Sequence, residues 1–230
     1  MIDAAHGLGT VSRSDPAAWR SFLASWERLD IDRYMADEGA YRLRRYSVLS
    51  CRGGGDLLEV APHEPHYQSI QYNPINGGIE RHFLPFEPDT LANPCLSSIT
   101  RFAVAVAREL RGIDDWRVQA HQFRILALAG ESGLPTPEGV HRDGADYVLI
   151  VLVARHNVTG GVTTLCNRDG SQLQELLLRE PLDALLLDDA RTRHGVSPIA
   201  RVSAEQIGYR DALVLTLHAQ NSFAIAMRGF

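Results

Sequence analysis

The sequence predicts a mainly β protein with flanking helices, arranged as a closed sandwich or jelly roll. From Trp116 onward, short strand-like runs follow one another closely, with no helical pattern between them. Before that point, helical and strand-like segments alternate. At 230 residues and 45% hydrophobic content, the chain can bury one sizeable core. We therefore expect a single domain over residues 1–230, with a helical or mixed part over 1–115 and a β core over 116–230.

Two helices are expected in the N-terminal half. The first begins after Ser14 or Asp15, either of which can cap it, with Pro16 in its first turn. The second is expected over residues 96–111, because Gly112 follows it as a C-terminal stop signal. The apolar residues of the first helix recur at helical spacing, which is typical of a core-facing helix: Trp19, Phe22, Leu23, Trp26 and Leu29.

Short strands are expected on both sides of the second helix. Residues 41–48 and 57–60 are strand-like, and Gly53, Gly54 and Gly55 between them indicate a turn. A phosphate cradle would need a following helix start with lysine, which the sequence lacks. The strand candidates of the C-terminal half are residues 118–127, 147–153, 161–166, 173–178, 184–187, 212–217 and 223–227.

Composition and charge favour a small-molecule partner. The net charge of −5 and the pI near 6.0 give no electrostatic reason to expect nucleic acid or an anionic membrane as a partner. No apolar stretch reaches the roughly 18 residues that a membrane-spanning helix needs. The scattered Cys51, Cys95 and Cys166, together with a start that lacks a basic leader region, predict a cytoplasmic protein. The sequence leaves the oligomeric state open.

One short motif points to a metal site. His141 and Asp143 are two residues apart, so in an extended segment their side chains project from the same face. His194 can complete the group only if the chain folds back. Two imidazoles and one carboxylate on one side of a metal leave other positions open, which is typical of non-haem Fe(II) oxygenases. Such a triplet also occurs by chance, but here it lies between a turn-rich run, residues 132–139, and the buried strand 147–153.

Arg210 is the next candidate functional residue. It lies immediately before the apolar strand 212–217, and an arginine that faces a barrel interior needs a carboxylate as its partner. A dicarboxylic cosubstrate would supply one. The strand positions in phase with Arg210 are mostly small, which leaves room for a ligand. The alternative is that Arg210 pairs with Asp211 or with another surface acid.

These motifs resemble a known enzyme family. The run PEGVHRDGADYVLIVLVARHNVTGGVTTL, together with LDDARTRHGVSPI and YRDALVLTL, is similar to the bacterial 2-oxoglutarate/Fe(II) dioxygenases of the L-isoleucine 4-hydroxylase type. The similarity extends over residues 41–219. It implies a double-stranded β-helix with a cupin-like jelly-roll fold, Fe(II), 2-oxoglutarate as cosubstrate, O2, and hydroxylation of a side-chain carbon of a free L-amino acid. Asp143 keeps the carboxylate that related halogenases lack, which implies hydroxylation or, less often, desaturation.

The resemblance also assigns individual residues. His141, Asp143 and His194 match the iron ligands of the family, and Arg210 matches the arginine that binds the distal carboxylate of 2-oxoglutarate. Many such enzymes have Ser or Thr two residues after this arginine, whereas this chain has Ala212. The second contact to the carboxylate must then come from another side chain. The candidates for that contact are Thr216, Thr164 or a tyrosine.

Substrate recognition is less constrained by the sequence. A free amino acid needs a cation for its carboxylate and an acid or carbonyl for its amine. His121 and Arg124 lie on opposite faces of one predicted strand, so one of them can face a pocket. Asp188 or Asp189 can orient a ligand histidine, or simply end a strand. The candidates for contact with the substrate are Tyr72, Asn73, Arg124 and Glu138, with Arg44 and Arg81 as further cations.

Three other functions fit parts of this pattern. The same chemistry could act on an amino-acid-like or carrier-tethered biosynthetic intermediate. A non-catalytic metal- or ligand-binding β-barrel would keep the three ligands without turning over 2-oxoglutarate. A cupin-like isomerase or dioxygenase would not need 2-oxoglutarate at all. Arg210 weighs against the last two alternatives, because neither needs a cation placed for a dicarboxylate.

Overall fold

The structure, a computed structural model, describes Leu8 and residues 15–52 and 57–220. The expected turn at 53–55 and the expected strand at 223–227 lie outside these residues. The large antiparallel sheet consists of β1 (Asp30–Ile31), β2 (Arg42–Arg52), β3 (Leu57–Val60), β6 (Trp116–Ala127), β7 (Tyr147–His156), β11 (Ala184–Asp188) and β14 (Gly208–Ala219). Its strands follow the order β1-β2-β6-β14-β7-β11, and β3 pairs with β2.

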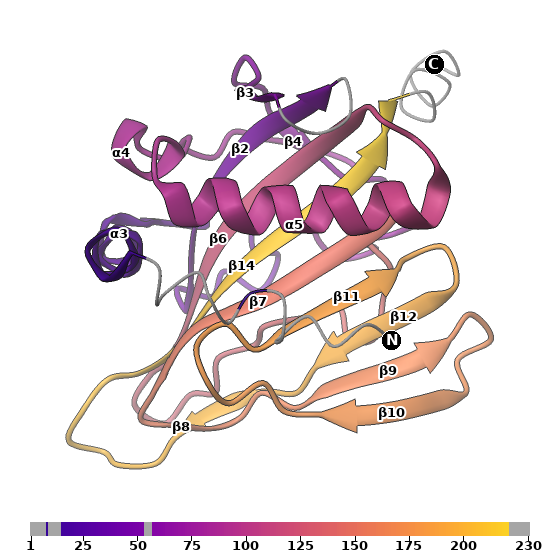
Figure 1. The fold of residues 1–230 in the computed structure, drawn as a ribbon. Helices are drawn as coiled ribbons and strands as arrows, with labels where there is room; N and C mark the ends of the chain where they lie inside the picture. The colour runs from indigo at the N-terminus through magenta and orange to yellow at the C-terminus, as the bar shows by residue number, and fades with distance from the viewer. Residues whose placement is uncertain (1–7, 9–14, 53–56, 221–230) are drawn as a thin grey trace.

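A smaller sheet forms a second layer that faces the large one. It consists of β9 (Thr163–Asn167), β10 (Gln172–Leu176) and β12 (Thr192–Val196), in the order β10-β9-β12 (Figure 1). Two short pairs complete the β structure: β8 (Val158–Gly160) with β13 (Ile199–Arg201), and β4 (His66–Tyr67) with β5 (Glu80–Arg81). Val148 and Ile150 of β7 pack with Leu165 of β9 between the layers. The predicted jelly-roll architecture, mainly β with flanking helices, is confirmed.

Helices cover the other face of the large sheet. The helices are α3 (Pro16–Ala24), the 3-10 helix η1 (Ser25–Arg28), α4 (Pro88–Leu91) and α5 (Pro94–Arg111). α5 lies across the sheet (Figure 1), and its Ile99 and Ala103 belong to the same buried core as Leu213 and Leu215 of β14. None of the helices in the described residues is long and apolar enough to cross a membrane.

The capping signals are confirmed with small shifts in the helix bounds. The Asp15 carboxylate accepts hydrogen bonds from the N–H groups of Ala17 and Ala18, as an N-cap should. α5 begins earlier than expected, at Pro94, because the side chain of Asn93 caps it. Gly112 ends α5 in the left-handed conformation, with φ of 66°.

The β core extends further upstream than the sequence predicted. β2 pairs with β6 from Arg42 to Cys51, so the boundary expected at residue 116 falls inside one continuous sheet. Pairing between strands so far apart in sequence leaves no local signal. β12 was also missed, because Thr192–Val196 is short and largely polar. The large sheet thus has one face against the helices and the other toward the candidate site.

Candidate metal and cosubstrate site

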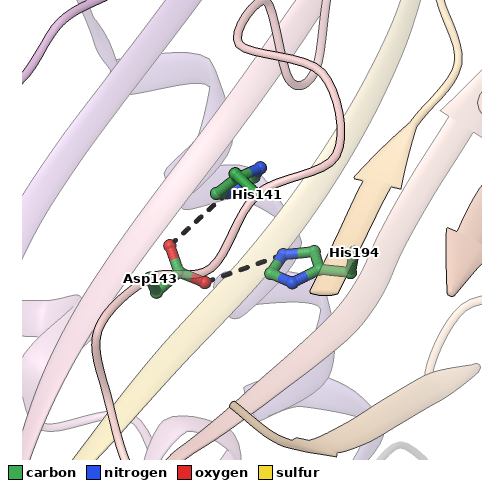
Figure 2. Close-up of side chains that lie close together, drawn as sticks. All are labelled: His141, Asp143 and His194. Atoms are coloured by element: carbon green, nitrogen blue, oxygen red, sulfur yellow. Dashed lines mark ion pairs between the residues drawn. The ribbon is translucent and has the colours of Figure 1, made fainter. Parts of the chain in front are cut away.

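The predicted metal ligands come together because the chain folds back on itself. His141 and His194 form an isolated antiparallel bridge, with reciprocal backbone N···O distances of 2.9 Å. β12 carries His194 and is held in place by its pairing with β9. Asp143 follows two residues after His141, and its carboxylate lies between the two imidazoles (Figure 2). The geometry that the motif requires is therefore present.

The three side chains form a compact group that could hold a metal ion. Their ligand atoms all lie within 4.8 Å of one another. The carboxylate oxygens of Asp143 lie 3.7 Å from His141 Nε2 and 3.6 Å from His194 Nε2. His141 Nδ1 lies 3.0 Å from the carbonyl oxygen of Gly139, so we assign the hydrogen to this nitrogen. Nε2 of His141 is then left to coordinate a metal.

The charge state of the group suits a divalent metal. Burial opposes ionisation of Asp143, but the two histidines beside it bring its pKa well below the usual range, so it is an anion at neutral pH. Burial and the neighbouring His141 lower the pKa of His194 to about 4, which leaves its imidazole neutral. Burial also acts to lower the pKa of His141, but Asp143 outweighs this effect and raises it to about 9. A metal would take the place of that proton.

Asp189 holds the loop that carries Asp143. Its carboxylate accepts hydrogen bonds from the backbone N–H groups of Asp143, Gly144 and Ala145, at 3.0, 2.8 and 3.1 Å. Burial and the nearby Asp143 charge raise the pKa of Asp189 to about 6. The sequence predicted that Asp188 or Asp189 could orient a ligand histidine. The structure shows instead that Asp189 fixes the backbone of the carboxylate ligand.

A cavity of about 470 Å³ opens beside this group on the free face of the large sheet. The three candidate ligands line it, and Arg210 lines it as well. The apolar part of the wall comes from alternating positions of β6, β7 and β14, whose side chains share one face of the sheet. These wall residues are Phe123, Ile125, Ile150, Ala212 and Val214. The volume is typical of small-molecule sites.

Arg210 is a buried residue in the wall of the cavity. It is 4% exposed, and its Nε and Nη2 are buried with no hydrogen-bond acceptor among the described residues. Burial lowers its pKa to about 10, so it stays cationic at neutral pH. The alternative that Arg210 pairs with Asp211 is wrong, because that carboxylate accepts two hydrogen bonds of 2.8 Å from Arg124 instead. Arg210 is therefore available for a ligand carboxylate.

Two of the predicted ligand contacts are wrong. Thr216 lies six residues beyond Arg210 on β14, which at about 3.3 Å per residue is roughly 20 Å away, too far to share one carboxylate. The Thr216 hydroxyl donates to Gln119 Oε1 at 3.3 Å. Arg124 does not line the cavity, because strand alternation directs it to the other face of β6, where it also pairs with Glu27.

The other substrate candidates do line the cavity. Glu138 Oε1 lies 3.4 Å from His141 Nε2, and its Oε2 is buried without a partner among the described residues. The ring of Tyr72 lies against Gly144, where an added Cβ would come within 2.6 Å of it. Asn73 donates from its amide to Gln68 Oε1 at 3.1 Å. Arg44 and Arg81, named as further cations, also line the cavity.

Two cavity residues gave little or no signal in the sequence. His121 was predicted only as one of two residues on opposite faces of a strand, and it faces the cavity. The sequence gives no signal for His66, because this residue lies on the short strand β4, far from any motif. Both are buried beside arginines.

Comparisons with known proteins identify the family of the chain. A family model described as 2OG-Fe dioxygenase matches residues 23–216. The chain is 28% identical over 194 residues to the L-isoleucine-4-hydroxylase of Bacillus thuringiensis, covering 81% of this chain and 80% of the relative. It is 24% identical over 196 residues to the 3(1)-hydroxy-L-isoleucine 4-dioxygenase of Pantoea ananatis (strain AJ13355), covering 83% and 77%.

A solved structure extends the similarity to the fold. The crystal structure of a bsmA homolog from Methylobium petroleophilum PM1 matches with a TM-score of 0.84 and 34% identity, over 93% of this chain and 85% of that chain. The family match covers most of the chain, including the three candidate ligands and Arg210. The family is defined by chemistry that uses Fe(II), 2-oxoglutarate and O2. This chain belongs to the 2OG-Fe dioxygenase family.

Proposed function

We propose that this enzyme hydroxylates an unactivated side-chain carbon of a free L-amino acid, with His141, Asp143 and His194 as the ligands of Fe(II). The observation that carries the proposal is the placement of this donor set and the unpartnered Arg210 in one cavity. Two imidazoles and one carboxylate on one side fit Fe(II) and leave positions for a bidentate cosubstrate and O2. Bound Fe(II) supplies the redox chemistry that couples 2-oxoglutarate decarboxylation to C–H oxidation.

Arg210 anchors the distal carboxylate of 2-oxoglutarate in this proposal. A buried guanidinium with two unpartnered nitrogens is suited to bidentate pairing with a carboxylate. The apolar walls around it exclude water, which strengthens that ion pair. In the overall reaction, one oxygen atom of O2 enters the substrate C–H bond as a hydroxyl group. The other enters succinate, and CO2 leaves.

The names of the relatives support an amino acid as substrate. Both curated relatives carry isoleucine or hydroxyisoleucine in their names. We propose that Glu138 Oε2, which has no partner among the described residues and lies near the candidate metal ligands, accepts from the substrate ammonium. Tyr72 and Asn73 belong to the same wall and would contact the substrate. Holding one C–H bond near the metal is the chain's main contribution to the rate.

We further propose that residues 1–230 act as one catalytic domain. The cavity wall includes Arg44 from the N-terminal part and Arg210 from the C-terminal part, on strands of the same sheet. Neither part would enclose the site alone. The cytoplasmic location expected from the composition stays a prediction.

Product analysis tests the proposed function directly. The enzyme is incubated with Fe(II), ascorbate, 2-oxoglutarate and a panel of free L-amino acids that includes L-isoleucine. We expect one panel member to gain a single oxygen atom, with succinate formed in equal amount. The Asp143→Ala variant is the control and should give neither product. Succinate formation with no oxidised amino acid across the panel would contradict the proposal and favour an amino-acid-like or tethered substrate.

A further inference from the structure

A second cationic group lies in the wall of the same cavity. Arg44 of β2 and Arg81 of β5 both line it and are 3% and 2% exposed. β6 separates β2 from β14, so the backbone at Arg44 is on the order of 10 Å from the backbone at Arg210. Arg44 and Arg81, here called the arginine pair, thus lie on other strands than Arg210.

Histidines, rather than carboxylates alone, hold the arginine pair. Arg44 Nη2 lies 2.7 Å from His121 Nδ1, and Arg81 Nη2 lies 2.9 Å from His66 Nδ1. A guanidinium N–H can only donate, so each Nδ1 must accept and each ring carries a single proton. Burial lowers the pKa of both histidines well below its usual range, which agrees with this assignment. The imidazoles orient the two cations without neutralising them.

Negative charge is scarce around the arginine pair. Asp32 lies 2.7 Å from Arg42 Nη2 and 3.5 Å from Arg44 Nη1. Arg81 forms no ion pair within the described part of the chain, and Arg42 and Arg44 share the single carboxylate of Asp32. The Nε atoms of Arg44 and Arg81 are buried and have no partner among the described residues. Because a buried cation without a counter-charge is costly, this group is suited to bind an anion.

Arg44 packs against aromatic rings, and the arginine pair lies close to the candidate metal ligands. The guanidinium carbon of Arg44 lies 3.8 Å from the ring centroid of Phe83 and 4.5 Å from that of Phe123. Gln68 connects Arg81 to the ligand loop. Its Oε1 lies 3.4 Å from Arg81 Nη2, and its Nε2 donates to the backbone oxygen of Asp143 at 3.3 Å. One amide side chain thus spans the distance from the cation to the metal group.

We propose that Arg44 and Arg81 bind the free carboxylate of the substrate, so that the enzyme requires an amino acid whose carboxyl group is not esterified or amidated. This inference rests on the proposed function and deepens it by naming the group that is recognised. A carrier-tethered aminoacyl group has a thioester instead of a carboxylate. It carries no negative charge at that position and leaves Arg81 without an ion-pair partner among the described residues. The buried cations therefore favour the free amino acid over a tethered one.

Calorimetric titration of the full chain, loaded with Fe(II) and 2-oxoglutarate in the absence of O2, tests the inference. L-Isoleucine carries both polar groups, 2-methylbutylamine lacks the carboxylate, and 3-methylpentanoate lacks the amine. The variants are Arg44→Gln and Arg81→Gln. Arg45→Gln is the matched control, because Arg45 lies on the same strand but donates to the Pro85 carbonyl at 2.7 Å, outside the cavity.

We expect Arg44→Gln and Arg81→Gln to weaken L-isoleucine binding by at least about tenfold, because each removes a buried charge from the carboxylate site. Arg45→Gln should bind L-isoleucine as the parent does. The parent should bind 3-methylpentanoate more tightly than 2-methylbutylamine. All three variants should keep the parent's affinity for 2-oxoglutarate. Arg81→Gln removes no ion pair within the described residues, so it tests the inference even if Arg44→Gln fails to fold.

The possible failures are distinguishable. Equal L-isoleucine binding by the parent and both cavity variants would overturn the inference and leave the proposed function intact. Weakened 2-oxoglutarate binding in Arg81→Gln would also overturn it, because the cosubstrate would then occupy the arginine pair. The third possible result is that the parent oxidises no free L-amino acid but binds 3-methylpentanoate more tightly than Arg81→Gln does. The proposed function would then be wrong, and the carboxylate site would still be supported.

Discussion

The cavity contains two cationic sides that are built in different ways. On the β14 side, Arg210 extends from one strand, and its Nε and Nη2 have no partner among the described residues. On the other side, Arg44 and Arg81 come from separate sheets and are each oriented by a neutral histidine. The candidate metal group lines the cavity with both. In our proposal the cavity thus holds two carboxylates apart: the single buried guanidinium of Arg210 binds one, and the arginine pair binds the other.

The largest effect is expected from variants of the candidate metal group, which lies in the cavity with both cationic sides. His141→Ala, Asp143→Ala or His194→Ala should each abolish activity and greatly weaken Fe(II) binding, because each removes one of three donors. Anaerobic metal titration measures the binding. His156→Ala is a matched control, since His156 is an exposed residue at the end of β7. Unchanged Fe(II) affinity in all three variants would mean that the metal lies elsewhere.

The next effect concerns the β14 side alone. Arg210→Ala should raise the 2-oxoglutarate requirement by at least about tenfold, since losing the charged partner of a buried carboxylate costs about 2 to 5 kcal/mol. Succinate formation is measured against 2-oxoglutarate concentration. Arg20→Ala, an exposed arginine on α3, is the control. An unchanged 2-oxoglutarate dependence in Arg210→Ala would remove this residue from the site.

A smaller effect is expected from Asp189, which holds the backbone of the Asp143 loop but is not one of the three candidate metal ligands. Asp189→Asn should lower Fe(II) affinity by roughly 10- to 100-fold, because it weakens the carboxylate that holds the Asp143 loop. Asp188→Asn is the control, since the Asp188 carboxylate accepts from the Ala190 N–H in its own turn. Equal Fe(II) affinities for the two variants would show that the loop does not need this carboxylate.

The smallest effect is expected at Gly144, in the loop that carries Asp143. Gly144→Ala combines a φ of 82° with a Cβ that would lie 2.6 Å from the Tyr72 ring, so it should lower both stability and Fe(II) affinity. Gly170→Ala has a φ of 90° and open space, so it should cost only about 1 kcal/mol of stability. Thermal unfolding and metal titration of both variants separate backbone strain from the clash. Parent-like Fe(II) binding in Gly144→Ala would exclude a positioning role for this contact.

The sequence predicts the residues of the Arg210 side more specifically than those of the arginine pair, for a physical reason. His141 and Asp143 are two residues apart, and Arg210 precedes an apolar strand, so local spacing made them candidates and the family resemblance gave each a role. The arginine pair depends on the pairing of β2 with β6 and of β4 with β5. Such long-range pairing has no local signature. It also explains why Arg124 was misplaced among the substrate residues, since its partner Asp211 is on another strand.

The predicted contact of Thr216 with the cosubstrate carboxylate does not match the structure, for a related reason. Its residue type fits a carboxylate contact, but the rise of a strand separates it from Arg210. Asp189 was found by its position next to β12, yet its hydrogen bonds to the Asp143 loop depend on the three-dimensional approach of two loops. Residue type and spacing identify which groups take part, whereas tertiary contacts determine what each one holds.

One cross-titration tests the central claim that the two sides bind different carboxylates. The parent, Arg210→Ala and Arg81→Gln are each titrated with 2-oxoglutarate and with L-isoleucine, with Fe(II) bound and O2 excluded. We predict that Arg210→Ala weakens 2-oxoglutarate binding, that Arg81→Gln weakens L-isoleucine binding, and that each variant keeps parent-like affinity for the other ligand. If either variant weakened both ligands equally while its melting temperature matched that of the parent, the account of two separate sides would be contradicted.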